Sequence, residues 1–125
     1  MAIEAQIEIA APPSKVREIL LDFSKYPQWH TTLIKLLNPE DSSKLLSALK
    51  PGDKVKCNFD DMKFVANITA NSENPFQWQG PLVHGLIKFM GPISFLMTPS
   101  VLGKKMVRQY NKFNSDLKYY AEAPG

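Results

Sequence analysis

The sequence predicts an α+β domain in which a curved antiparallel sheet packs against one long C-terminal helix. Strands in hairpin-like succession occupy the middle of the chain, where residues 54–59 and 63–70 flank a tight connection at Asp60-Asp61. An apolar stripe at steps of three and four residues then predicts a helix, and its members are Leu102, Met106, Tyr110, Phe113, Leu117 and Tyr120. Packing the sheet against this helix buries the apolar face of each.

The first third of the chain predicts one strand followed by two short helices. Isoleucine and alanine alternate with polar residues over residues 3–9, which is typical of a half-buried strand. Pro12 and Pro13 end that strand, and either Ser14 or the prolines begin a short helix. Residues 22–27 form a turn or a second short helix. Residues 31–37 are rich in β-branched and apolar residues and predict the next strand.

Turn-forming residues separate the remaining elements. Residues 38–52 predict a loop with a helical turn at residues 44–49, and Pro51-Gly52-Asp53 predicts a tight turn. A further strand is expected at residues 76–79, with Phe76 and Trp78 on one face. Pro99 and Ser100 lie where the long helix is expected to begin, because proline and a hydroxyl side chain suit a helix start.

Length and composition predict a single globular domain over residues 1–125. The 44% hydrophobic and 22% charged content excludes a disordered chain, and the net charge of +3 is too small to indicate nucleic-acid binding. Lys104, Lys105, Arg108 and Lys112 follow helical spacing, which predicts a solvated helix face. One cysteine excludes an intramolecular disulfide, and no signal peptide or membrane-spanning run is recognised, so a cytoplasmic location with no stable membrane insertion is predicted.

Several strings in the sequence resemble the START-like superfamily with the helix-grip fold, which includes polyketide cyclase/dehydrase-type proteins and the birch-pollen-allergen type. The matching strings are "IEIAAPPSKVREILLDFSKYPQWH" at 7–30, "LKPGDKV" at 49–55, "ENPFQWQG" at 73–80 and "VLGKKMVRQYNKFNSDLKYYAE" at 101–122. The resemblance covers most of the chain and implies a cavity between sheet and helix that takes lipids, polyketides or similar apolar molecules. None of these strings is a catalytic signature.

One segment departs from the family pattern. In the family, the strand at "FQWQG" is followed by at least two more long strands before the helix, whereas residues 81–96 offer room for one strand at 83–90. His84-Gly85 then stands as a remnant of the first of these strands, and residues 91–96 form the entrance to the helix. The sheet is therefore expected to be short by about one hairpin.

The candidate site residues are few. His84, in an apolar run that looks buried, and Tyr110, on the long helix, are the candidates for proton transfer, with a structural or surface histidine as the alternative at position 84. A catalytic role is less favoured for His30, which ends the "YPQWH" turn. The expected ligand-binding residues, for which plain core packing is the alternative, are Trp29, Phe59, Phe64, Trp78, Met106, Phe113 and Asn114.

No metal or other cofactor is predicted, because neither histidine has a second ligand at metal-binding spacing. Cys57 alternates with apolar residues and is expected to point inward as a small apolar side chain without a neighbouring base.

Two functions from different classes follow, together with an expectation about assembly. The first is a binder of a small hydrophobic molecule. The second is a cyclase, dehydratase or isomerase that acts on a polyketide-type or other apolar metabolite through His84 and Tyr110. Because an open sheet edge invites pairing, the missing hairpin also predicts a homodimer formed through that edge.

Overall fold

A single antiparallel sheet curves around one long helix in the computed structural model, which describes residues 3–60, 62–80, 84–90, 92–98 and 103–124. Within these residues the sheet has seven strands in the order β1-β7-β6-β5-β4-β3-β2. The strands are β1 (Ile3–Ile7), β2 (Ile34–Pro39), β3 (Lys54–Phe59), β4 (Met62–Asn71), β5 (Phe76–Gln79), β6 (His84–Lys88) and β7 (Ile93–Thr98). The helices are α1 (Pro13–Leu20), the 3-10 turns η1 (Phe23–Gln28) and η2 (Leu46–Ala48), and α2 (Gly103–Glu122).

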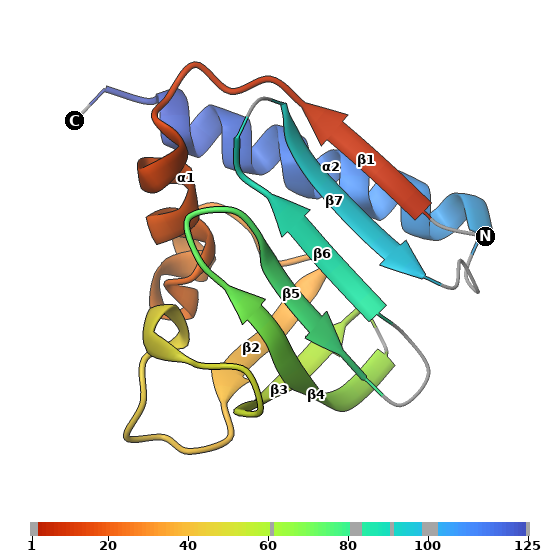
Figure 1. The fold of residues 1–125 in the computed structure, drawn as a ribbon. Helices are drawn as coiled ribbons and strands as arrows, with labels where there is room; N and C mark the ends of the chain where they lie inside the picture. Colours follow the sequence, from red (N-terminus) through yellow and green to blue (C-terminus); the bar gives the residue numbers. More distant parts are fainter. Residues whose placement is uncertain (1–2, 61, 81–83, 91, 99–102, 125) are drawn as a thin grey trace.

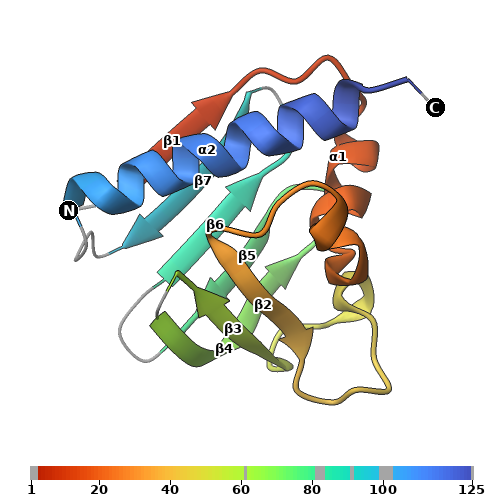
Figure 2. The same ribbon diagram turned by 180° about the vertical axis from the view of Figure 1, so that it is seen from behind.

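The long helix α2 covers one face of the sheet. Figure 2 shows it lying across β7 and beside β1, with α1 at its C-terminal end. The chain starts at one edge of the sheet with β1, and α1 and η1 then carry it to the opposite edge, where β2 lies (Figure 1). The predicted α+β class, with two short helices after the first strand, is confirmed.

The inner face of the sheet, which we define as the face toward α2, is apolar because side chains alternate along each strand. In β3, Val55, Cys57 and Phe59 are buried, whereas Lys54 and Lys56 are exposed. The buried side of α2 completes this core with Tyr110, Phe113, Leu117 and Ala121. The inward orientation predicted for Cys57 is therefore confirmed.

The predicted loss of a hairpin is wrong. Two strands, β6 of five residues and β7 of six, lie where one longer strand was expected. Residues 93–96, expected at the entrance to the helix, belong to β7, which pairs with both β6 and β1. Pro99 and Ser100 lie outside the described residues, and α2 is described from Gly103.

The second strand lies further along the chain than predicted. The expected strand at residues 31–37 is observed at Ile34–Pro39. The backbone N–H groups of Leu33 and Ile34 donate to the ring of His30, which turns the chain before the strand begins. The strands at residues 54–59 and 76–79 are confirmed with the predicted bounds, and η2 lies within the predicted turn at 44–49.

Gly85 allows a close approach between β5 and β6. It is the direct cross-strand partner of Trp78. A Cβ atom built at Gly85 would lie 1.8 Å from Cζ2 of the Trp78 indole, far inside van der Waals contact. The indole thus lies against the bare backbone of β6, and only glycine leaves room for it.

Arg17 connects α1 to two distant turns. Its guanidinium donates to the carbonyl oxygen of Ser72 (Nε to O, 2.8 Å), to the carbonyl oxygen of Ser47 (3.4 Å) and to Oδ1 of Asn71. The amide nitrogen of Asn71 in turn donates to the carbonyl oxygens of Leu46 and Leu49. This network fixes the loop that contains η2 against both α1 and the end of β4.

We expect Arg17→Met to lower the free energy of unfolding by about 1.5–3 kcal/mol, because the charge-assisted hydrogen bonds that join α1 to the two distant turns are lost. Urea denaturation followed by circular dichroism measures this change. Lys15→Met, on the exposed side of the same helix, is the matched control and should change stability by less than about 0.5 kcal/mol. Equal effects of the two substitutions would contradict the role given to Arg17.

Candidate ligand-binding site

The sheet side of the candidate site is a wall of aromatic rings on β3, β4 and β5. Phe59 contacts Phe64 and Trp78 edge-to-face, with ring centroids 5.5 and 5.8 Å apart. Phe76 lies 5.9 Å from Trp78. Three of these residues were predicted ligand-binding residues, and the structure brings Phe59, Phe64 and Trp78 together on the inner face.

The helix side of the site contains Tyr110, Phe113 and Asn114. The three side chains are buried on one stripe of α2, as their spacing predicted. Asn114 is 2% exposed, and among the described residues neither its amide oxygen nor its amide nitrogen has a hydrogen-bond partner. Met106 was also predicted to bind ligand, but its side chain lies outside the described residues.

One end of the core is closed by aromatic residues of η1 and α2. Trp29 lies 4.6 Å from Tyr26 and 5.6 Å from Phe113, measured between ring centroids, and it stacks on Tyr120 at 6.0 Å. Trp29 is half-buried, and its indole nitrogen has no hydrogen-bond partner within the described part of the chain. This predicted ligand-binding residue therefore lies with Phe113, at the junction between η1 and α2.

His30 is a buried structural residue. Its Nε2 accepts hydrogen bonds from the backbone N–H of Leu33 (3.0 Å) and of Ile34 (3.4 Å). Because backbone N–H groups can only donate, Nε2 carries no proton, and Nδ1 donates to Oδ2 of Asp116 at 2.9 Å. Burial lowers the pKa of His30, and the opposing effect of Asp116 is smaller. The neutral ring thus connects the chain before β2 to α2.

The titratable groups of the core are poorly suited to proton transfer near neutral pH. Burial raises the pKa of the Tyr110 hydroxyl and of the Tyr26 hydroxyl, and it raises the pKa of the Cys57 thiol to about 12. His30 has both ring nitrogens occupied. None of these four side chains offers a free acid or base to a bound molecule.

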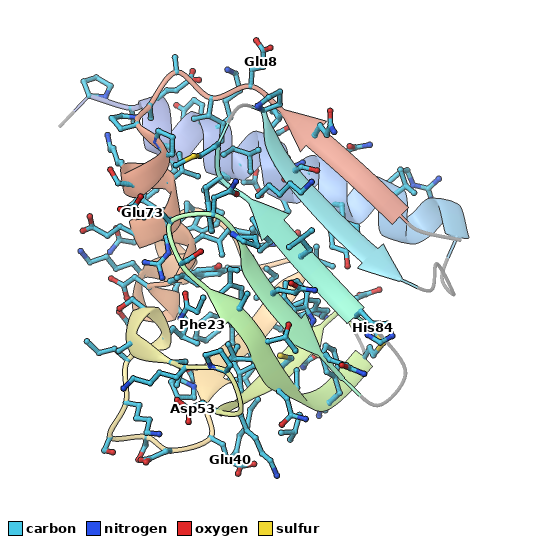
Figure 3. The ribbon with its side chains drawn as sticks, in the orientation of Figure 1. Glu8, Phe23, Glu40, Asp53, Glu73 and His84 are labelled. Carbon is cyan, nitrogen blue, oxygen red and sulfur yellow. The ribbon has the colours of Figure 1, made fainter. Side chains whose placement is uncertain are left out.

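His84 is exposed, which agrees with the alternative of a surface histidine and not with the buried position that its apolar run suggested. It begins β6 at the side of the molecule, as the label in Figure 3 shows. Gly85 and Ile87 are the buried residues of this strand, and alternation directs His84 to the opposite, outer face. His84 and Tyr110, predicted to act together, therefore lie on different sides of the sheet.

Two residues show what sequence reasoning could and could not find. Asn114 was identified because it lies one turn after Tyr110 on a predicted helix. The structural role of His30 was missed because its partner Asp116 is 86 positions away in the sequence. The sequence around "YPQWH" contains no signal for that pairing.

Hollows lie at the end of the molecule that contains η1. An open groove of about 640 Å³ is lined by residues of η1, β2, β3 and the loop after β2, and includes Phe23, Leu36, Leu45 and Lys56. A smaller hollow of about 150 Å³ lies beside Tyr26, His30 and Lys35. Among the described residues, none that lines either hollow comes from α2, so neither hollow borders the buried stripe of that helix.

Among the residues described, no three histidine, cysteine or acidic side chains come close enough together to hold a metal ion. In the same part of the chain, no helix combines the length and the apolar character that crossing a membrane requires.

The architecture is similar to solved structures of low sequence identity. A START superfamily protein from Mycobacterium smegmatis is 18% identical, with a TM-score of 0.54 and 97% of each chain covered. Major latex-like protein 151 from Panax ginseng is 12% identical, with a TM-score of 0.63 and 98% of each chain covered. The chain has the START-like helix-grip fold.

A third similar structure extends this likeness to a two-domain protein. The START-like fold of this chain aligns over its full length with 51% of the di-domain ARO/CYC BexL of the BE-7585A biosynthetic pathway, at 12% identity and a TM-score of 0.67. No family model matches the sequence, and no curated protein matches it. At identities this low, the structural similarity establishes the fold and does not establish the ligand or the reaction.

Proposed function

We propose that this START-like chain acts as one domain over residues 1–125 and binds a small hydrophobic molecule, lipid-like or polyketide-like, between the sheet and α2. The observation that carries the proposal is Asn114, a buried amide whose oxygen and nitrogen both lack partners. A buried amide without hydrogen bonds destabilises a folded protein, and a bound molecule that supplies them removes this cost. Aromatic walls with a few polar groups are typical of sites for such molecules.

The contacts favour binding over catalysis. The alternative, a cyclase, dehydratase or isomerase, was assigned to His84 and Tyr110. His84 is exposed on the outer face and Tyr110 is buried on the inner side, so the two side chains have no common substrate position. The remaining titratable side chains of the core have either occupied hydrogen-bonding atoms or raised pKa values.

Nile red, a neutral apolar dye, tests the proposal. The folded protein is expected to bind the dye with enhanced fluorescence, and a natural apolar ligand should displace it. Ala66→Leu adds volume to the inner face and is expected to weaken binding, whereas Val65→Leu, on the exposed side of the same strand, should not. Leu45→Ser and Tyr119→Ser remove exposed apolar side chains and control for binding at the surface. A folded protein that binds no dye would contradict the proposal.

The homodimer was predicted from a missing hairpin, and this reason no longer holds because the hairpin is present. The outermost strands in the described sheet are β1 and β2, and an association through either edge stays a prediction. Light scattering after size-exclusion chromatography tests it.

The proposed cytoplasmic location agrees with a single buried cysteine thiol.

A further inference from the structure

Asn114 differs from the other two polar residues that are buried in the described part of the chain. Where burial is described, the buried polar side chains are His30, Ser94 and Asn114. His30 uses both ring nitrogens in hydrogen bonds, and Ser94 also has an interaction partner. Asn114 presents one acceptor, Oδ1, and one amide donor group, Nδ2, with no partner for either. Buried polar groups are nearly always hydrogen-bonded, so a molecule from outside the chain is expected to complete these bonds.

The surroundings of Asn114 limit the charge of that molecule. Neighbouring positions on the same stripe of α2 are Tyr110, Phe113 and Leu117, and all three are fully buried. Among the described side chains, no lysine, arginine, aspartate or glutamate is buried. An ionised head group placed here would lose its hydration without gaining an opposite charge, which is strongly unfavourable.

We propose that Asn114 binds the head group of the ligand, and that this head group is uncharged and both donates and accepts a hydrogen bond. An alcohol or a carboxamide has this chemistry, because its O–H or N–H donates to Oδ1 and its oxygen accepts from Nδ2. An ionised carboxylate does not, since it has no proton to donate to Oδ1. This inference rests on the proposed function and adds the class of head group to it.

Four eight-carbon compounds that differ in the head group test the inference by displacing Nile red: 1-octanol, octanamide, octanoate at about pH 8, where it is ionised, and n-octane. The wild-type protein is expected to release the dye at about tenfold lower concentrations of octanol and octanamide than of octane, which corresponds to one or two net hydrogen bonds. Octanoate is expected to be weaker than octanol.

Asn114→Leu assigns the preference to this side chain. The variant replaces the amide with an apolar group of similar size. The concentration of octane that releases the dye, divided by the corresponding concentration of octanol, is therefore expected to fall to about one. Its melting temperature without ligand should rise by a few degrees, since an unpaired buried amide has been removed. Asn111→Leu, an exposed asparagine on the same helix, is the matched control and should keep the wild-type ratio. If Asn114→Leu does not fold, Asn114→Ala is used for the same ratio.

Each outcome separates the two proposals. If the folded protein binds no Nile red, the proposed function fails and this inference fails with it. If the dye binds but the four compounds displace it alike, the head-group inference is overturned and the proposed function stands. A preference for octanol that persists in the Asn114 variants also overturns it, because the amide would then hold a bound water only.

Discussion

Replacing His30 by alanine is expected to lower the free energy of unfolding by about 3–5 kcal/mol, the largest effect of any single substitution considered. The change removes a fully buried ring and leaves two backbone N–H groups, those of Leu33 and Ile34, without an acceptor. Asp116 also loses its contact with the ring and keeps its ion pair with Lys112. Urea denaturation at neutral pH measures the loss.

The second histidine is a natural control. His84 is exposed at the start of β6, so His84→Ala should change the free energy of unfolding by less than about 0.5 kcal/mol. If the two alanine variants were equally stable, the hydrogen bonds by which His30 connects β2 and α2 would not contribute to the free energy of unfolding.

The same residue predicts how stability depends on pH. The pKa of His30 is lowered in the folded protein from its ordinary value of 6.5, so protonation favours the unfolded chain. The stabilisation is complete above about pH 6.5 and decreases as the pH falls below that value. The pKa values of Asp41, Asp53 and Glu122 are lowered by hydrogen bonds from the main chain and side chains around them, so their contributions change only at more acidic pH.

His30→Gln tests this pH dependence, because glutamine offers an acceptor atom and does not titrate. Thermal unfolding between about pH 7 and pH 5 should show a decline for the wild-type protein and a flatter profile for the variant. A decline of equal size in both proteins would assign the pH dependence to other groups.

Gly85→Ala is expected to lower the free energy of unfolding by about 2–3 kcal/mol. The new methyl group would lie 1.8 Å from Cζ2 and 2.1 Å from Cε2 of the Trp78 indole, so the ring or the strand must shift. Because the indole packs on Phe59 and Phe76, a shift of the ring disturbs the aromatic wall of the proposed site. The intrinsic fluorescence of Trp78 should change together with the unfolding midpoint.

A double-mutant cycle separates this clash from the general cost of adding a side chain. In a Trp78→Leu background, Gly85→Ala should cost at least about 1 kcal/mol less than in the wild-type background. Gly52→Ala is the control: the strain at Gly52 comes from its φ of +95°, with no atom within 4 Å of the added Cβ, so its cost should be the same in both backgrounds. Additive effects of Gly85→Ala and Trp78→Leu on the free energy of unfolding would show that the Trp78 indole is not the reason why position 85 requires glycine.

The elements that the sequence predicted correctly are those whose apolar and polar residues repeat with the period of a strand or a helix. The strands β3 and β5 alternate apolar and polar residues, and the inward stripe of α2 repeats at helical spacing, so their faces could be identified in advance. The strand β7 contains the run Ile93–Thr98, in which apolar residues dominate without alternation, and its pairing with β1 and β6 determines its structure. The tertiary pairing, not the local pattern, produced the hairpin that the sequence reasoning left out.

The residues of the candidate site were predicted correctly where helix periodicity places them, and not where their position depends on strand register or on distant contacts. Asn114 was found because helix periodicity places it beside Tyr110. The orientation of His84 depends on the register in which Gly85 meets Trp78, and a one-residue difference would reverse it. The hydrogen bond between His30 and Asp116 joins residues that only the complete fold brings together.

The pairing of the first strand with the last one has a consequence for how the protein is made. β1 hydrogen-bonds along β7, with Ile3 opposite Met97, and the backbone N–H of Ala10 donates to the carboxylate of Glu122. Contacts between such distant residues slow folding, because the chain must close a long loop before they form. Until β7 has been translated, β1 therefore has no partner strand in the described sheet. We expect the nascent chain to depend on chaperones until α2 has been translated.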